Sequence, residues 1–317
     1  MRILVTGGAG SVGSALVSSL LDKGLNVRVL DKTIGKLAGL KEPNLEVFGA
    51  GIEDLEKVES AMKDVDVVYH LAESYSSQPR EAFEIDVRGN INLLETAVKY
   101  NVGHFIFTST ARVYGKPRYL PVDEGHPCNA EDSGRRLYAI SKLSGEKLCL
   151  LYHREHNLPI TIFRFWWAYG ADIGGRALRT LIDTALKGGT IRVPDGAGGS
   201  FLHDDDTARA FELATLTEKA YGQVFNLSSG FFTSWQELAE LACQSTNSSS
   251  KMELMPRDTW TGDASIGSDP DIAERWDIGI GKAKQVLGYK PRHSPEEAKR
   301  LLSEAINKLV LTRKKVV

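Results

Sequence analysis

The chain of 317 residues lacks the features that mark secreted, membrane-spanning and metal-binding proteins. It has only 3 cysteines, far apart in sequence, which fits a reducing compartment better than a disulfide framework. None of them has a second Cys or a His at the spacing of a zinc site, so we expect no metal. No run approaches the ~20 apolar residues of a membrane-spanning helix. A first strand is predicted almost at the amino terminus, with no extended apolar segment before it, and we expect a cytoplasmic protein.

An excess of one charge is also missing. The 41 acidic and 39 basic residues are interspersed and sum to a formal net charge of −2. This balance favours neither nucleic acid nor a membrane surface as a partner, and we expect a small-molecule substrate. The length allows one large domain or two fused domains with a substantial core, and no repeat or linker divides the chain.

A glycine-rich turn near the amino terminus is the most informative stretch. Residues 2–5 predict a buried strand, and apolar residues at helical spacing from 12 to 20 predict a helix. Gly7, Gly10 and Gly13 lie on the turn between the two. In a dinucleotide fingerprint the first glycine takes the tight turn, the second admits the pyrophosphate, and the third lets the helix pack on the sheet. We therefore predict a dinucleotide site here.

An acidic residue follows where such a site needs one. Residues 25–30 predict a second strand ending at Asp31, which lies 18 positions beyond Gly13 (31 − 13), close to the ~20 at which a carboxylate meets the adenosine ribose. A carboxylate there repels a 2′-phosphate, so NAD is favoured over NADP, although Lys32 beside it weakens this preference slightly.

Strand and helix signals then alternate through the first half of the chain. Further strands are predicted over 45–48, 66–70, 104–109 and 160–163, with helices over 53–63 and 83–98. The second helix rests on a four-residue step of apolar side chains at Phe83, Val87, Ile91, Leu94 and Val98. The alternation predicts an α/β fold with a Rossmann-like, doubly wound parallel sheet.

The character of the chain changes after the strand at 160–163. Residues 1–165 are predicted to form the NAD-binding domain, and 166–317 mostly a smaller C-terminal substrate-binding lobe, with segments returning to the main sheet around 201–230. Capping boxes predict two late helices, one opening at Thr233 and one at Ser294.

Tyr138 and Lys142 lie four residues apart near the start of a predicted helix, so both can face one cofactor. A tyrosine with a pKa near ~10 is a poor base at neutral pH, but a nearby ammonium lowers that pKa. Tyr138 is therefore predicted to act as general base and acid, with Lys142 also binding the nicotinamide ribose. Thr110, just after the strand at 104–109, is predicted to help hold a substrate oxygen; the alternative is a threonine that caps a loop.

The motifs along the chain resemble, in order, those of extended short-chain dehydrogenases/reductases of the NAD-dependent epimerase/dehydratase type, including nucleotide-sugar 4-epimerases. The matching segments are 6–13, His70-Leu71-Ala72, 109–115, Tyr138 with Lys142, Arg164 with Tyr169-Gly170, 201–206 and 282–291. The resemblance implies bound NAD and a homodimer formed through the helix before the strand at 104–109 and the helix of Tyr138.

The resemblance also implies which residues meet the ligands. For the cofactor these are Gly7, Gly10, Ser11, Val12, Gly13, Asp31, Lys32, Gly51, Ile52, Leu71, Ala72, Thr108, Tyr138 and Lys142. For the substrate they are Glu73, Arg112, Trp166, Trp167, Arg176, Gly199 and His203, and for catalysis Thr110, Tyr138 and Lys142.

Several of these positions depart from the family pattern. Trp167 stands where nucleotide-sugar enzymes usually have an asparagine, and Gly199 where they usually have an arginine. Asp86 replaces a usual asparagine, and Glu73 replaces a small residue. Arg112 could bind an anionic group of the substrate or form a structural ion pair.

Two further positions keep alternatives open. Trp166 and Trp167 could form a sugar-stacking wall or belong to the core. His203 is expected to be structural rather than catalytic, since no partner is visible that would make it a base.

Three functions remain open from the sequence. The first is an NAD-dependent epimerase of a sugar or sugar nucleotide, and the second is a dehydrogenase of a smaller sugar, sugar acid or other hydroxy compound that releases NADH. The third is a non-catalytic NAD sensor, which the intact Tyr138 and Lys142 disfavour.

Overall fold

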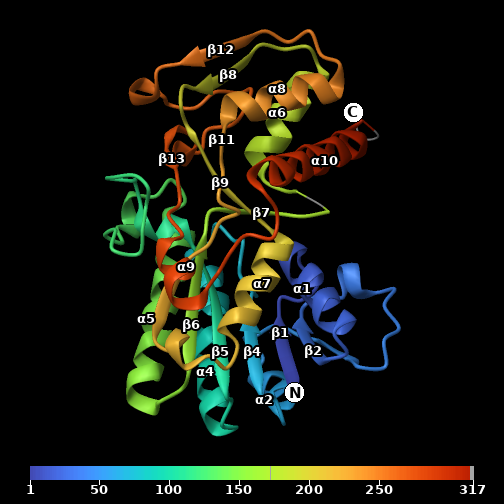
Figure 1. The fold of residues 1–317 in the computed structure, drawn as a ribbon, viewed down its shortest axis with the longest axis vertical. Coiled ribbons are helices and arrows are strands. Elements are labelled where there is room, and N and C mark those ends of the chain that lie inside the picture. Colours follow the sequence, from blue (N-terminus) through green and yellow to red (C-terminus); the bar gives the residue numbers. More distant parts are fainter. Residues whose placement is uncertain (172, 315–317) are drawn as a thin grey trace.

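A seven-stranded parallel sheet forms the lower part of the molecule in Figure 1, a computed structural model that describes residues 1–171 and 173–314. Its strand order is β10-β6-β5-β4-β1-β2-β3, and all six neighbouring pairs are parallel. The strands are β1 (Arg2–Thr6), β2 (Asn26–Asp31), β3 (Leu45–Gly49), β4 (Val67–His70), β5 (His104–Thr110), β6 (Ile160–Phe165) and β10 (Gln223–Asn226). The predicted Rossmann-like α/β fold is confirmed.

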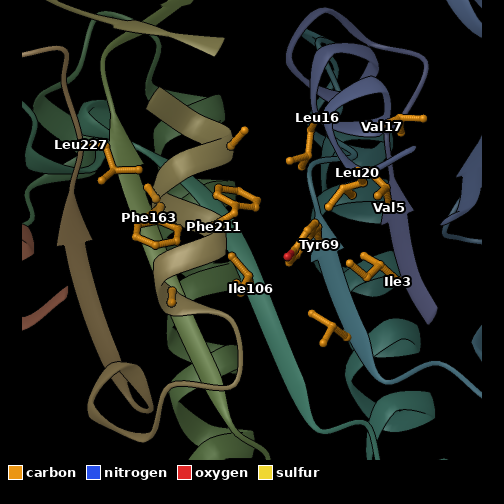
Figure 2. Packing of buried hydrophobic residues seen from close by; sticks show 14 of the residues in the cluster. Ile3, Val5, Leu16, Val17, Leu20, Tyr69, Ile106, Phe163, Phe211 and Leu227 are labelled. Atoms are coloured by element: carbon orange, nitrogen blue, oxygen red, sulfur yellow. The ribbon is translucent and has the colours of Figure 1, made fainter. Parts of the chain in front are cut away.

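Helices cover both faces of this sheet because successive strand residues alternate between the two faces. Ile3 and Val5 pack on one side, as Figure 2 shows, while Leu4 packs on the other. The first side is covered by α1 (Ser11–Asp22), α7 (Asp204–Ala214) and α9 (Gly281–Leu287), and the second by α2 (Leu55–Met62), α4 (Asn90–Lys99) and α5 (Arg136–His156). The carboxyl ends of the strands are thereby left as the open edge of the sheet.

A second group of elements lies beyond that edge, at the top of Figure 1. A small mixed sheet contains β7 (Trp167–Tyr169), β9 (Gly198–His203), β11 (Phe232–Ser234) and β13 (Arg275–Trp276), and a two-stranded sheet contains β8 (Ile191–Pro194) and β12 (Met252–Met255). The helices α6 (Arg176–Leu186), α8 (Trp235–Thr246) and α10 (Pro295–Arg313) pack with them around a separate apolar core. Segment 201–230 connects the two parts, since β9 lies in the small sheet and β10 in the large one.

The helix predicted over 83–98 is present but interrupted. It consists of α3 (Pro79–Phe83), a π-helical segment (Glu84–Gly89) and α4. A π turn contains an extra residue, which rotates the side chains that precede it relative to those that follow. Asp86 is therefore buried while Phe83, expected on the apolar stripe, is exposed.

The two late helices begin close to the predicted positions. α10 follows the Ser294 cap, as expected. The capping box of α8 is formed by Ser234 and Glu237, one residue later than the predicted start at Thr233. Thr233 instead belongs to β11, so its backbone pairs in the small sheet.

Candidate active site

The glycine turn joins β1 to α1 in a conformation that excludes larger residues. Gly7 has a φ of 70°, and a Cβ added to it would lie 2.6 Å from the backbone N of Ala72. A Cβ on Gly13 would collide with the carbonyl oxygen of Gly7. The first turn of α1 begins with the uncharged residues Ser11 and Val12, so the positive end of this helix is available to an anion. The turn therefore fits the pyrophosphate of a dinucleotide.

Asp31 ends β2 directly beside this turn. Its Oδ2 accepts a hydrogen bond from the backbone N of Ala9 at 2.9 Å, and its Oδ1 accepts one from the backbone N of Thr33 at 3.0 Å. The carboxylate is thus held next to the glycines, where the adenosine ribose of NAD would meet it. Lys32 turns away to pair with Glu53 at 2.7 Å.

The remaining residues predicted to meet the cofactor follow the next strands of the same edge. A Cβ on Gly51 would collide with the side chains of Lys32 and Glu53, so this segment lies against the end of β2. Ile52 is buried, and the backbone N of Leu71 donates to the carbonyl of Thr6 at 3.1 Å. Their positions are compatible with a dinucleotide, and their contacts with it stay predictions.

Tyr138 and Lys142 lie in the first two turns of α5 and converge on Glu73, three residues after β4. The Tyr138 hydroxyl donates to Glu73 Oε2 at 2.8 Å, and Lys142 Nζ lies 3.0 Å from the same oxygen. Lys142 is buried, and its Nζ also donates to the carbonyl oxygen of Thr108 at 3.0 Å. The structure therefore joins the predicted pair through a third residue.

This contact changes the expected electrostatics of Tyr138. Burial, followed by the negative charge of Glu73, raises the pKa of Tyr138 well above its ordinary value, opposite to the predicted direction. Burial also raises the pKa of Glu73, but the Lys142 ammonium and hydrogen bonds from Tyr75, Lys142 and Tyr138 outweigh it, and the pKa falls below its ordinary value. At neutral pH Glu73 is thus ionised and Tyr138 protonated.

Thr110 ends β5, at the carboxyl edge of the sheet as predicted. Its Oγ1 accepts a hydrogen bond from the backbone N of Arg112 at 3.3 Å and caps the short 3₁₀ turn Ala111–Tyr114. The capping alternative is therefore realised, and the contact with a substrate oxygen stays a prediction. The neighbouring Thr108 contributes a buried hydroxyl that lacks a hydrogen-bond partner among the described residues.

Arg112 forms an ion pair with two carboxylates that are distant in sequence. Its guanidinium contacts Asp271 and lies 3.3 Å from Asp269. Asp271 is buried and also accepts hydrogen bonds from the Ser133 hydroxyl at 2.9 Å and the Gly134 backbone N at 2.6 Å. This is the structural pair that the sequence left open, while binding of a substrate anion by Arg112 stays untested.

The two tryptophans pack into an aromatic cluster below the small sheet. The ring centroids of Trp166 and Trp167 are 5.2 Å apart, and each ring also contacts Phe201 and Trp235. A Cβ on Gly199 would collide with the indole of Trp166. An arginine at position 199 is therefore incompatible with Trp166 where it stands, so the departure at Gly199 is physically linked to the indole of Trp166.

Arg176 and His203 lie on separate elements. Arg176 is exposed at the first residue of α6. His203 caps α7, since its Nδ1 accepts a hydrogen bond from the backbone N of Asp205 at 3.2 Å. His203, Asp205 and His293 also bring potential metal ligands within 4.8 Å of one another, but the Nδ1 lone pair of His203 already accepts the capping bond. Burial lowers the pKa of His203, which favours the neutral ring.

A buried ion pair one turn along α5 was not predicted as part of the site. Arg164 Nε donates to Glu146 Oε1 at 2.8 Å, and the same carboxylate accepts a hydrogen bond from Ser109 at 2.5 Å. Glu146 lies four residues after Lys142, so the helical spacing already placed both on one face. The pair anchors α5 to β5 and β6 and thereby fixes the position of Lys142.

With this geometry in view, comparison with known proteins identifies the family. Residues 3–228 match the NAD dependent epimerase/dehydratase family. The chain belongs to this family. Its cofactor is NAD, as predicted, and the glycine turn with Asp31 fits that cofactor.

Members of the epimerase/dehydratase family whose names give different activities resemble the chain. A putative UDP-glucose 4-epimerase of Methanocaldococcus jannaschii is 36% identical over 253 residues, or 75% of this chain and 80% of the relative. UDP-glucuronic acid decarboxylase 4 of Arabidopsis thaliana is 32% identical over 312 residues, or 92% of this chain and 65% of the relative.

Solved structures of the same family superpose over nearly the whole chain. UDP-glucose 4-epimerase from Thermotoga maritima with UDP-glucose has a TM-score of 0.77 and 28% identity, covering 98% of this chain and 100% of the other. UDP-glucuronic acid 4-epimerase from Bacillus cereus, in complex with UDP-glucuronic acid and NAD, has a TM-score of 0.79 and 26% identity with the same coverage. Across residues 1–171 and 173–314, no helix of this family member is long and apolar enough to cross a membrane.

Proposed function

We propose that the protein is an NAD-dependent epimerase that inverts a secondary hydroxyl carbon of a sugar or sugar nucleotide. The observation that carries this proposal is that the side chains of Tyr138 and Lys142 meet at Glu73, just after the end of β4. The residue before Glu73, Ala72, lies against Gly7 of the glycine turn. NAD, when bound at the glycine turn, would supply reversible two-electron oxidation at the substrate carbon. Tyr138 takes the hydroxyl proton during oxidation and returns it during reduction, when the other face of the carbonyl is presented.

Lys142 and Thr110 are the other residues proposed to support this chemistry. The Lys142 ammonium, held by the Thr108 carbonyl, is available to the nicotinamide ribose. The Thr110 hydroxyl at the end of β5 is proposed to bind the substrate oxygen that Tyr138 deprotonates. Residues 166–317 would mostly cover the substrate, which is consistent with the position of the small sheet, α6, α8 and α10 beyond the open edge of the large sheet.

A second function, oxidation of a smaller sugar, sugar acid or other hydroxy compound with release of NADH, is favoured by the aromatic cluster. Trp166 occupies the space that a side chain at position 199 would need, and Trp167 replaces a usual amide. Both changes remove polar groups expected to contact a diphosphate. Indole rings instead offer flat apolar surfaces that suit the face of a sugar.

One experiment separates the two functions. The purified protein is analysed for bound NAD and incubated with UDP-glucose or UDP-glucuronic acid, the molecules in the relatives' structures. The products are separated by chromatography. For the epimerase we expect that the protein retains its NAD and forms a 4-epimeric product. Release of NADH in proportion to the added substrate would instead support the dehydrogenase.

We also propose a cytoplasmic homodimer that buries the exposed apolar side chains of α3 and α5. Phe83, Ile140 and Leu151 are exposed on these helices, which the family resemblance places at the subunit contact. An Ile140→Asp variant that stays dimeric in sedimentation analysis would exclude this face.

A further inference from the structure

The carboxylate of Glu73 occupies the point where the two catalytic side chains meet. One oxygen, Oε2, lies 2.8 Å from the Tyr138 hydroxyl and 3.0 Å from Lys142 Nζ. The side chain of Glu73 is 18% exposed and that of Lys142 is 4% exposed, so solvent screens this contact weakly. The preceding residue, Ala72, packs directly on Gly7. The backbone of Glu73 is therefore positioned by the turn that binds the cofactor.

The charges at this point determine where a proton can go. Lys142 neutralises Glu73, and the pKa of Glu73 lies below its ordinary value although burial raises it. The pKa of Tyr138 is raised, first by burial and then by the Glu73 charge. Before Tyr138 can accept a substrate proton, its own proton must therefore pass to an acceptor. Glu73 Oε2 is the acceptor to which that proton is already hydrogen-bonded.

We propose that Glu73 accepts the proton of the Tyr138 hydroxyl while Tyr138 accepts the proton of the substrate hydroxyl. This inference rests on the proposed epimerase reaction. As the substrate carbon is oxidised by two electrons with NAD as the oxidant, the substrate O–H bond breaks and an O–H bond forms on Tyr138. The original Tyr138 O–H bond breaks, and its proton forms an O–H bond on Glu73 Oε2. Both transfers reverse when the carbonyl is reduced, so the number of protons is conserved.

Other charged groups surround Glu73 without replacing it. Asp86, from the π segment, is bonded to the Ser74 backbone N at 2.6 Å and to the Ser141 hydroxyl at 2.8 Å. Arg135 lies with its guanidinium 5.0 Å from the centre of the Tyr138 ring and lowers the pKa of that tyrosine. Tyr75 also hydrogen-bonds to Glu73.

The pH dependence follows from these charges. Glu73 must be ionised to accept the proton, so kcat should fall at acid pH as Glu73 becomes protonated. Lys142 is the basic group that contacts Glu73 directly, at 3.0 Å. Asp86 is the other nearby carboxylate, and burial raises its pKa. The test must therefore distinguish these two acids.

The test compares Glu73→Gln with Glu73→Asp and with Asp86→Asn. In Glu73→Gln we expect kcat to fall by about 10²-fold, the size of a lost acid–base contribution, with little change in KM and with the acid limb of the kcat profile abolished. Glu73→Asp should restore the limb. Asp86→Asn should retain it, since Asp86 contacts Ser74 and Ser141 rather than Tyr138.

A second readout does not depend on turnover. In protein without NAD, the ionisation of Tyr138 is followed by ultraviolet difference absorbance, with Tyr138→Phe subtracted. In Glu73→Gln the carboxylate no longer opposes the phenolate and Lys142 is released, so the pKa of Tyr138 should fall by more than about 1 unit. Thermal unfolding checks that each variant is folded.

The outcomes are distinguishable. An acid limb that persists in Glu73→Gln, with kcat within about threefold of wild type, would overturn the proposal. An unchanged pKa of Tyr138 in that variant would overturn it as well. If the wild-type protein converts none of the sugars, the proposed function fails, but the titration still decides whether Glu73 controls the Tyr138 proton.

Discussion

The two sides of the candidate site have diverged differently from the family pattern. On the cofactor side, Gly7, Asp31 and Lys142 retain the expected residue types, and their contacts fit NAD. On the side of the small sheet, Trp167 and Gly199 replace groups usual for nucleotide-sugar enzymes. The residue types on the cofactor side are therefore retained, and those on the side of the small sheet are remodelled.

The remodelled side also shows that its changes are not independent. Trp166 can lie over position 199 because that residue is glycine, and Trp167 can lie over Gly175 for the same reason. Each indole fills the space of a missing side chain, so the cluster forms a continuous apolar wall. The position of each indole therefore depends on the absence of a side chain at the glycine it covers.

The largest expected effect lies on the retained side. Tyr138→Phe removes the hydroxyl that exchanges the substrate proton but keeps the ring and its packing. We expect kcat to fall by about 10²- to 10⁴-fold, the usual contribution of a general acid–base group, with NAD binding retained. Initial rates and the bound NAD content after purification measure the two properties.

A tyrosine on the same helix supplies the control. Tyr152→Phe changes a tyrosine near the end of α5. It should leave both kcat and NAD content unchanged, since the Tyr152 ring packs against His156 rather than at the site. Full activity of Tyr138→Phe would show that the Tyr138 hydroxyl takes no part in the proton transfer.

The sequence predicted the retained side better than the remodelled one for a physical reason. The glycine turn and the pairing of Tyr138 with Lys142 depend on residues within one turn or one helix, where spacing determines geometry. The contact between Glu73 and Tyr138 joins residues 65 positions apart, which no local pattern reveals.

Long-range packing limited the other predictions in the same way. The ring of Trp166 over Gly199 depends on the pairing of β7 with β9, which local patterns do not predict. The π segment was missed because the four-residue apolar step at Phe83 and Val87 is typical of a regular helix, and the hydrogen bonds of Asp86 to Ser74 and Ser141 join residues that no local pattern relates. The six predicted strands, which correspond to β1–β6, agree with the structure within a few residues because their apolar runs are short and bounded.

A smaller effect is expected where the two sides meet, at Arg112. Arg112→Ala leaves the buried Asp271 carboxylate with only the Ser133 and Gly134 donors, so the free energy of unfolding should fall by about 3 kcal/mol. We expect KM to stay within about twofold, because the guanidinium is already paired with Asp269 and Asp271.

Chemical denaturation and initial rates measure these two effects, with the exposed Arg80→Ala on α3 as the control. A tenfold rise in KM for a charged sugar, with no rise for an uncharged one, would contradict this expectation and indicate that Arg112 binds the charged group of the substrate.

The smallest expected effect tests the coupling within the remodelled side. Gly199→Ala places a Cβ against the Trp166 indole and should lower the free energy of unfolding by about 1–3 kcal/mol, the usual cost of overpacking. Gly39→Ala is the matched control, because a Cβ there would have no atom within 4 Å. Trp166→Leu should remove most of the cost of Gly199→Ala when the two are combined, so the double variant should be more stable than the sum of the single changes predicts. If the losses in the free energy of unfolding were strictly additive in chemical denaturation, Trp166 and position 199 would not be energetically coupled. The contacts of the remodelled side would then be separate rather than cooperative.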